Sequence, residues 1–147
     1  MCIPMGKPDA IARLAGNEKA PCLYGRVKFY QMGNAVLVVA DLCGLPASDT
    51  GFFGFHIHEG ADCNGPQFSN TGGHYAPGEE PHPMHAGDLP PLLCCGGKAF
   101  LAVLTNRFSL REIMGRTVVL HSQPDDFHSQ PAGNAGAKIA CGVIRPF

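Results

Sequence analysis

The sequence predicts an all-β domain, and three observations support this fold class. Among the 147 residues, 19 glycines and 13 prolines divide the chain into short apolar segments. Several segments are rich in Val, Ile, Leu and Phe, and residues 25–30 (GRVKFY) alternate as a half-buried strand does. The pairs Gly33-Asn34 and Gly96-Gly97 are typical of tight hairpin turns.

Seven strands are expected from these segments, and one short helical turn is expected at residues 109–113. The strands cover residues 10–16, 22–32, 34–42, 52–58, 98–105, 116–121 and 138–144. No repeat or linker divides the chain, so we expect a single domain over residues 1–147, of which 1–21 is the least defined segment.

Charge and the N-terminus set expectations about partners and compartment. The formal net charge of -1 gives no reason to expect nucleic acid or an acidic membrane as a partner. The start of the chain has neither a basic nor an apolar leader region, which favours a cytoplasmic protein. A mature chain trimmed for the periplasm or the cell exterior would begin in the same way. The odd count of seven cysteines leaves unpaired thiols, which suit a reducing compartment.

Two long segments do not fit any strand pattern. Residues 59–97 are rich in Gly and Pro, and residues 122–137 are polar. Long irregular connections in compact domains are usually functional or disordered. The first segment carries His74, His82, His85 and Asp88, so we expect a loop ordered by a metal.

Six of the seven histidines fall into three short clusters. His56 and His58 stand two apart in an apolar strand, so both rings project from one face. His121 ends another strand and brings a third ring if that strand lies beside the first. A single histidine in such a place is more often a structural residue than a ligand. Because His121 would lie near His56 and His58, a metal site is favoured.

The loop cluster differs in chemical type, because His74, His82 and His85 stand with Asp88 within 15 residues. A closed set of His and Asp ligands suits structural zinc, whereas imidazoles in a planar or tetragonal arrangement suit copper(II). The six rings and the carboxylate supply two sites if one histidine serves both metals. His74 is the candidate, because two cations would stabilise its imidazolate.

Five motifs then match one family in order. They are residues 54–59 (GFHIHE), Gly73-His74 with Pro77, residues 85–88 (HAGD), residues 118–121 (VVLH) and residues 133–144 (GNAGAKIACGVI). From about residue 22 to its end, the chain resembles the copper/zinc superoxide dismutases. The resemblance implies copper ligands at His56, His58, His74 and His121. It implies zinc ligands at His74, His82, His85 and Asp88, one copper and one zinc per subunit, and a linking carboxylate at Asp125.

The resemblance also implies a fold of eight strands, a Greek-key β-sandwich flattened into a barrel with long metal-binding loops. The eighth strand is expected near residues 108–110 or within 90–95. Cys63 and Cys141 match the family's disulfide. The other cysteines are expected to be free thiols without an assigned function, and they are Cys2, Cys22, Cys43, Cys94 and Cys95.

The implied activity is the conversion of two superoxide anions and two protons into oxygen and hydrogen peroxide by copper redox cycling, in antioxidant defence. His74 would then carry a proton as well as act as a ligand. Lys138 occupies the position where the family usually has an arginine, which keeps the charge and loses the planar fork. We expect a slower approach of the anion. His128 matches no ligand position and is expected to be an exposed loop residue.

Two alternative functions are also compatible with the sequence. One is a non-catalytic relative that delivers or holds copper, although no ligand is missing here. The other is a zinc-only structural or interaction module. Family members dimerise through different surfaces and no residue selects one, so both a homodimer and a monomer are compatible with the sequence.

Overall fold

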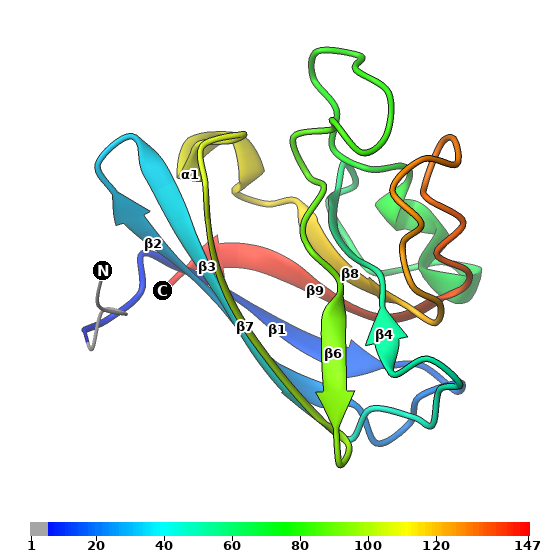
Figure 1. The fold of residues 1–147 in the computed structure, drawn as a ribbon. Coiled ribbons are helices and arrows are strands. Elements are labelled where there is room, and N and C mark those ends of the chain that lie inside the picture. The colour runs from blue at the N-terminus through cyan, green and yellow to red at the C-terminus, as the bar shows by residue number, and fades with distance from the viewer. Residues whose placement is uncertain (1–5) are drawn as a thin grey trace.

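A computed structural model describes residues 6–147, and its fold is all-β, as predicted (Figure 1). None of the helices in this part of the chain is long and apolar enough to cross a bilayer. The strands are β1 (Ala10–Gly16), β2 (Tyr24–Met32), β3 (Ala35–Cys43), β4 (Phe52–Phe53), β5 (Phe55–His58), β6 (Leu92–Cys95), β7 (Lys98–Thr105), β8 (Thr117–His121) and β9 (Lys138–Pro146). The helices are the 3₁₀ segment η1 (Pro66–Thr71) and α1 (Leu110–Ile113).

The strands form one antiparallel sheet that nearly closes on itself. The order is β4-β6-β7-β3-β2-β1-β9-β8-β5, in which β3 lies beside β7 and β1 beside β9, as in a Greek key. The two end strands, β4 and β5, are joined through Gly54. Its N–H donates to the Gln123 carbonyl and its own carbonyl accepts from the His121 N–H. Residues 52–58 therefore contact both ends of the sheet and close the barrel.

The nine segments correspond to the eight expected strands, with one of them divided. The expected strand at 52–58 breaks at Gly54, because its first part pairs with β6 and its second part pairs with β8. The eighth strand is β6, within 90–95 rather than near 108–110. Both hairpin turns are present, with φ of 63° at Gly33 and 57° at Gly96. The helical turn is also present, and Ser109 and Glu112 form its capping box.

The core lies inside the barrel and separates the two faces of β5. Phe55 and Ile57 are fully buried in the main apolar cluster, so the period of two places His56 and His58 on the opposite face. Figure 1 shows the long loops, in green and orange, gathered on that side of the barrel. Both histidines are buried there.

One disulfide attaches the first long loop to the last strand. It joins Cys63 to Cys141 across 78 residues, which is the pair expected from the resemblance. Among the described residues, the free thiols are Cys22, Cys43, Cys94 and Cys95. Cys2 lies outside the described residues.

Candidate metal centre

The first long loop returns along β5 and brings its donors beside those of the strand. The Tyr75 N–H donates to the Ile57 carbonyl over 2.9 Å, and the Ile57 N–H donates to the Gly87 carbonyl over 2.8 Å. These bonds create isolated bridges that pair His58 with His74 and His56 with Asp88. On the other edge of β5, the β8 ladder positions His121.

The predicted donors form two buried groups that share one ring. In each group the donor atoms lie within 4.8 Å of one another, the distance range in which one ion can be bound. The strand donor group consists of His56, His58, His74 and His121. The loop donor group consists of His74, His82, His85 and Asp88.

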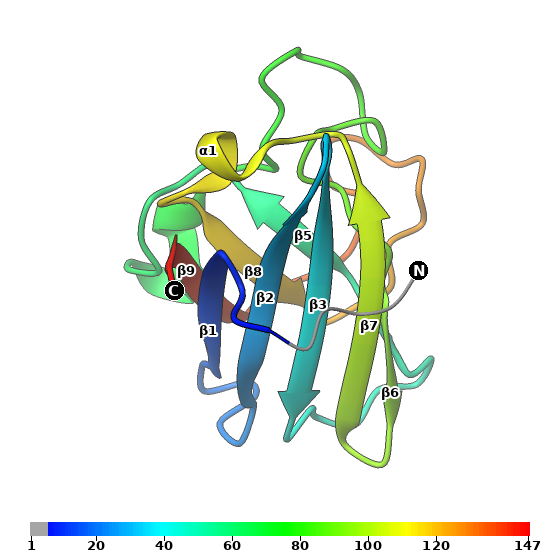
Figure 2. The same cartoon turned by 90° about the vertical axis from the view of Figure 1, so that its left-hand side faces the viewer.

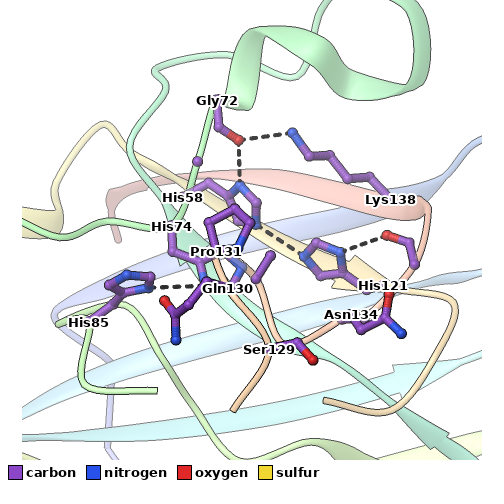
Figure 3. A pocket seen from close by; sticks show the side chains of 14 residues that line it. His58, Gly72, His74, His85, His121, Ser129, Gln130, Pro131, Asn134 and Lys138 are labelled. Atoms are coloured by element: carbon purple, nitrogen blue, oxygen red, sulfur yellow. Dashed lines mark hydrogen bonds between the residues drawn. The ribbon is translucent and has the colours of Figure 1, made fainter. Parts of the chain in front are cut away.

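Hydrogen bonds on the far ring nitrogens orient His58 and His121. His58 Nδ1 donates to the Gly72 carbonyl at 2.9 Å, and His121 Nδ1 donates to the Gly136 carbonyl at 3.3 Å. The two Nε2 atoms then carry lone pairs, and they face each other at 3.1 Å (Figure 3). Two acceptors this close repel each other unless a cation lies between them.

Asp125 orients one ring of each donor group. Its Oδ2 accepts from His56 Nε2 and its Oδ1 accepts from His82 Nε2, both at 2.7 Å. The link expected for this carboxylate is therefore present. The two Nδ1 atoms are left as lone pairs, buried and without a hydrogen-bond partner in residues 6–147. His82 Nδ1 does lie 3.0 Å from Asp88 Oδ2, but a lone pair facing a carboxylate oxygen is repulsive without a cation.

His74 is the shared ring, and its two nitrogens have different surroundings. Nδ1 lies 2.8 Å from Asp88 Oδ1 and 3.4 Å from His85 Nδ1, which places it in the loop donor group. Nε2 is buried and has no hydrogen-bond partner among the described residues, so it is left for the strand donor group. Buried polar atoms without partners are costly, and a bound cation would satisfy this one. The residues present therefore fit two adjacent metal ions.

Burial keeps three rings of the strand donor group, His56, His58 and His121, in the protonation state that metal binding requires. Desolvation lowers the pKa of His56 to about 4 and that of His121 to about 3, and it lowers the pKa of His58 well below its usual value. These rings are neutral at pH 7. Burial would raise the pKa of Asp125, but the hydrogen bonds from His56 and His82 outweigh it and lower that pKa.

A cleft of about 770 Å³ opens onto the strand donor group, and Figure 3 shows its lining. His58, His74 and His121 lie on its wall, and Lys138 is the one lysine or arginine among the described residues that line it. Lys138 Nζ donates to Thr71 Oγ1 at 2.7 Å and to the Gly72 carbonyl at 2.9 Å. Two of the three ammonium donors are therefore bound to the loop, and one remains for an anion.

Three supporting residues were missed by the sequence reasoning. Gln130 connects the two long loops, because its Nε2 donates to the His82 carbonyl at 2.7 Å and its Oε1 accepts from the His82 N–H at 2.9 Å. No sequence signal predicted this clamp or the role of Thr71. Gly133 belongs to the last motif, and a Cβ there would collide with Asp125 and His82. His128 is exposed, as expected.

The fold and the site together define a class of protein. It is a β-barrel with two adjacent donor groups that share His74 and could each hold a metal ion. Comparison with known proteins is more specific, because a family model described as copper/zinc superoxide dismutase matches residues 23–144. The chain belongs to the copper/zinc superoxide dismutase family.

Curated relatives of the same name cover most of the chain. A copper-zinc superoxide dismutase of Legionella pneumophila is 37% identical over 145 residues, covering 93% of this chain and 87% of that protein. Copper-zinc superoxide dismutase 2 of Aquifex aeolicus is 35% identical over 136 residues, covering 82% and 78% respectively. Copper-zinc superoxide dismutase 3 of Arabidopsis thaliana is 33% identical over 158 residues, covering 96% and 92%.

Proposed function

We propose that this chain is a superoxide dismutase that holds one copper ion in the strand donor group and one zinc ion in the loop donor group. The observation that carries the proposal is His74, whose Nδ1 contacts the loop donor group while its buried Nε2 has no protein partner among the described residues. A ring used in this way joins a redox site to a structural site. It also agrees with the names of the relatives.

The assignment of metals follows from the donors. Four imidazoles beside an open cleft suit copper(II), and the cleft gives a small anion access to it. Three imidazoles and the Asp88 carboxylate form a closed set, which suits structural zinc. Zinc would hold the first long loop in place without taking part in electron transfer.

The residues of the chain supply binding and proton handling around the copper. Copper, when bound, supplies the one-electron oxidation of one superoxide and the one-electron reduction of another. Lys138 attracts the anion into the cleft and offers it one ammonium donor. With zinc held at Nδ1, His74 Nε2 would be the atom that carries a proton when copper does not hold it. Asp125 keeps the His56 and His82 rings in the required tautomers.

The test is metal analysis together with a superoxide assay on protein reconstituted with copper and zinc. One copper and one zinc per chain with rapid dismutation is expected. Copper binding without dismutation would indicate a non-catalytic copper protein instead. Zinc binding without copper uptake would indicate a structural module. A His74→Ala variant should lose dismutation, and it should bind both metals more weakly because each group loses a ligand.

A further inference from the structure

The outer face of β1, β2, β3 and β7 has an unusual composition. Figure 2 shows these strands side by side facing the viewer, and alternation along each strand sends every second residue outward. Outward positions in these strands hold four of the 11 Lys and Arg residues but only one of the 12 Asp and Glu residues, Asp41. The face is therefore basic although the whole chain is slightly acidic. Its cations are Arg13, Arg26, Lys28 and Lys98.

Neither member of the central pair of cations, Arg13 and Arg26, forms an ion pair within the described residues. Arg13 and Arg26 are directly opposite each other on β1 and β2, an arrangement in which like charges destabilise a sheet. All ion pairs within residues 6–147 involve histidines, so neither guanidinium has one. Asp41 is opposite Arg26 on the next strand without reaching it as an ion pair. An anion bound between the two guanidiniums would remove the repulsion.

A cleft opens at this pair. It has a volume of about 500 Å³, and Arg13, Tyr24, Arg26 and Asp41 are among its lining residues. Tyr24 is 65% exposed, and its hydroxyl adds a hydrogen-bonding group beside the guanidiniums. A phosphate group matches the donors of Arg13, Arg26 and Tyr24, because a guanidinium can bind phosphate through two parallel hydrogen bonds, and it would be held away from the Asp41 carboxylate.

Exposed apolar side chains stand among the cations. Phe100 is 62% exposed and Leu104 is 43% exposed, both on β7, and Phe100 is opposite Asp41 in the sheet. A nucleic acid would use the cations but not Leu104. A second copy of the chain would place its own four cations against these four. An anionic bilayer uses both kinds of side chain, because cations bind the headgroups while aromatic rings lie at the interface.

We propose that this basic-aromatic face (Arg13, Tyr24, Arg26, Lys28, Lys98, Phe100 and Leu104) docks the protein on a bilayer that contains anionic phospholipid. The Arg13–Arg26 pair holds a lipid phosphate, and Phe100 enters the interface. In Figure 1 the long loops lie on the side of the barrel opposite β2 and β3, so docking leaves the cleft at the donor groups open. The net charge of -1 predicted no such partner, because a sum over the whole chain does not show where on the surface the charges lie.

Co-sedimentation of the full, metal-loaded chain with vesicles tests the proposal. Binding to phosphatidylcholine vesicles that contain phosphatidylglycerol is expected, with little binding to pure phosphatidylcholine and release by salt. Each lost cation should lower the partition coefficient about fivefold, so Arg13→Gln with Arg26→Gln should lower it about 25-fold. Phe100→Ser should lower it about tenfold and leave the salt dependence unchanged.

Arg111→Gln is the control for the loss of one charge, because it removes one cation from an exposed position on α1. It should bind as the unaltered chain does. A loss of about fivefold in this control would overturn the proposal, as would an Arg13/Arg26 variant that binds normally.

Sedimentation without lipid gives a third readout. If the chain dimerises and Phe100→Ser makes it monomeric, the face is a subunit interface instead. Inorganic phosphate is then added to chain bound on vesicles. Displacement only at phosphate concentrations high enough to act as salt would support the bilayer as the ligand. Displacement at low phosphate concentration would overturn this and indicate free phosphate as the ligand.

Discussion

The two donor groups need the same kind of atoms, but the chain supports them differently. His56, His58 and His121 lie on strands, where the β5–β8 ladder sets their positions. His82, His85 and Asp88 lie on an irregular loop, where individual hydrogen bonds and one disulfide replace the ladder. Metal sites with similar ligands can therefore depend on independent supports. Changes to the loop supports should affect the loop donor group first.

His74 and Asp125 are the exceptions, because each belongs to both regions. His74 is a member of both groups, and Asp125 hydrogen-bonds one ring from each. A change that is meant to separate the two groups must leave these two residues intact.

The disulfide should give the largest effect. Cys63→Ser frees the loop from β9 and opens a covalent loop of 78 residues, which should lower the free energy of unfolding by about 4–5 kcal/mol in the chain-entropy model. Urea unfolding of the metal-free protein measures this change. Cys22→Ser, which alters a free exposed thiol, is the control and should have little effect. Equal stability of the two variants would show that the disulfide does not anchor the loop.

Acid should act on the strand donor group of the metal-free protein. The folded-state pKa of His56 is about 4 and that of His121 is about 3, both below the value of 6.5 in the unfolded chain. As pH falls below 6.5, the unfolded state therefore binds protons first and stability is lost, until pH reaches the folded values. The loss from His56 alone is on the order of 3 kcal/mol.

Urea midpoints measured between pH 7 and pH 4 check this loss. His121→Gln removes one of the titrating groups and should flatten the profile. His128→Gln changes an exposed histidine and should leave it unchanged. A profile of the unaltered protein that is flat over this range would contradict the assigned cause.

The zinc affinity should respond to Gln130, which clamps the backbone of His82. Gln130→Met keeps the size of the side chain and removes both hydrogen bonds. Zinc affinity should fall about 10- to 100-fold, the usual effect of losing a group that orients a metal ligand. Copper affinity should change much less, because the strand donor group keeps its ladder. Competition with a zinc chelator and with a copper chelator measures the two affinities separately.

The matched control is Gln31→Met, which removes side-chain hydrogen bonds at the β2–β3 hairpin. It should leave both affinities unchanged. If Gln130→Met lowers both affinities equally, the two groups do not have independent supports and the comparison fails.

The sequence predicted the strand side of the molecule better than the loop side for a physical reason. A period of two shows that His56 and His58 share a face, and the turn residues Gly33 and Gly96 mark the hairpins. The loop donors were predicted from residue types and from the family resemblance. Their supports follow no period: the Gln130 clamp joins residues 48 apart in the chain, and the Lys138–Thr71 contact joins residues 67 apart. The break at Gly54 was also missed, because only closure of the barrel requires it.

Lys138 should give the smallest effect, and it concerns the path of the anion rather than either support. Two of its three ammonium donors are bound by Thr71 Oγ1 and the Gly72 carbonyl. An arginine carries five donors and could make both contacts with donors to spare, at the same charge. Lys138→Arg should therefore raise kcat/KM for superoxide roughly twofold to fivefold, since only the geometry of anion binding changes. Lys138→Gln removes the charge and should lower kcat/KM and its dependence on ionic strength. Pulse-radiolysis rates at several salt concentrations measure both variants, and an unchanged or lower value for Lys138→Arg would show that the lysine already presents the anion as well as an arginine could.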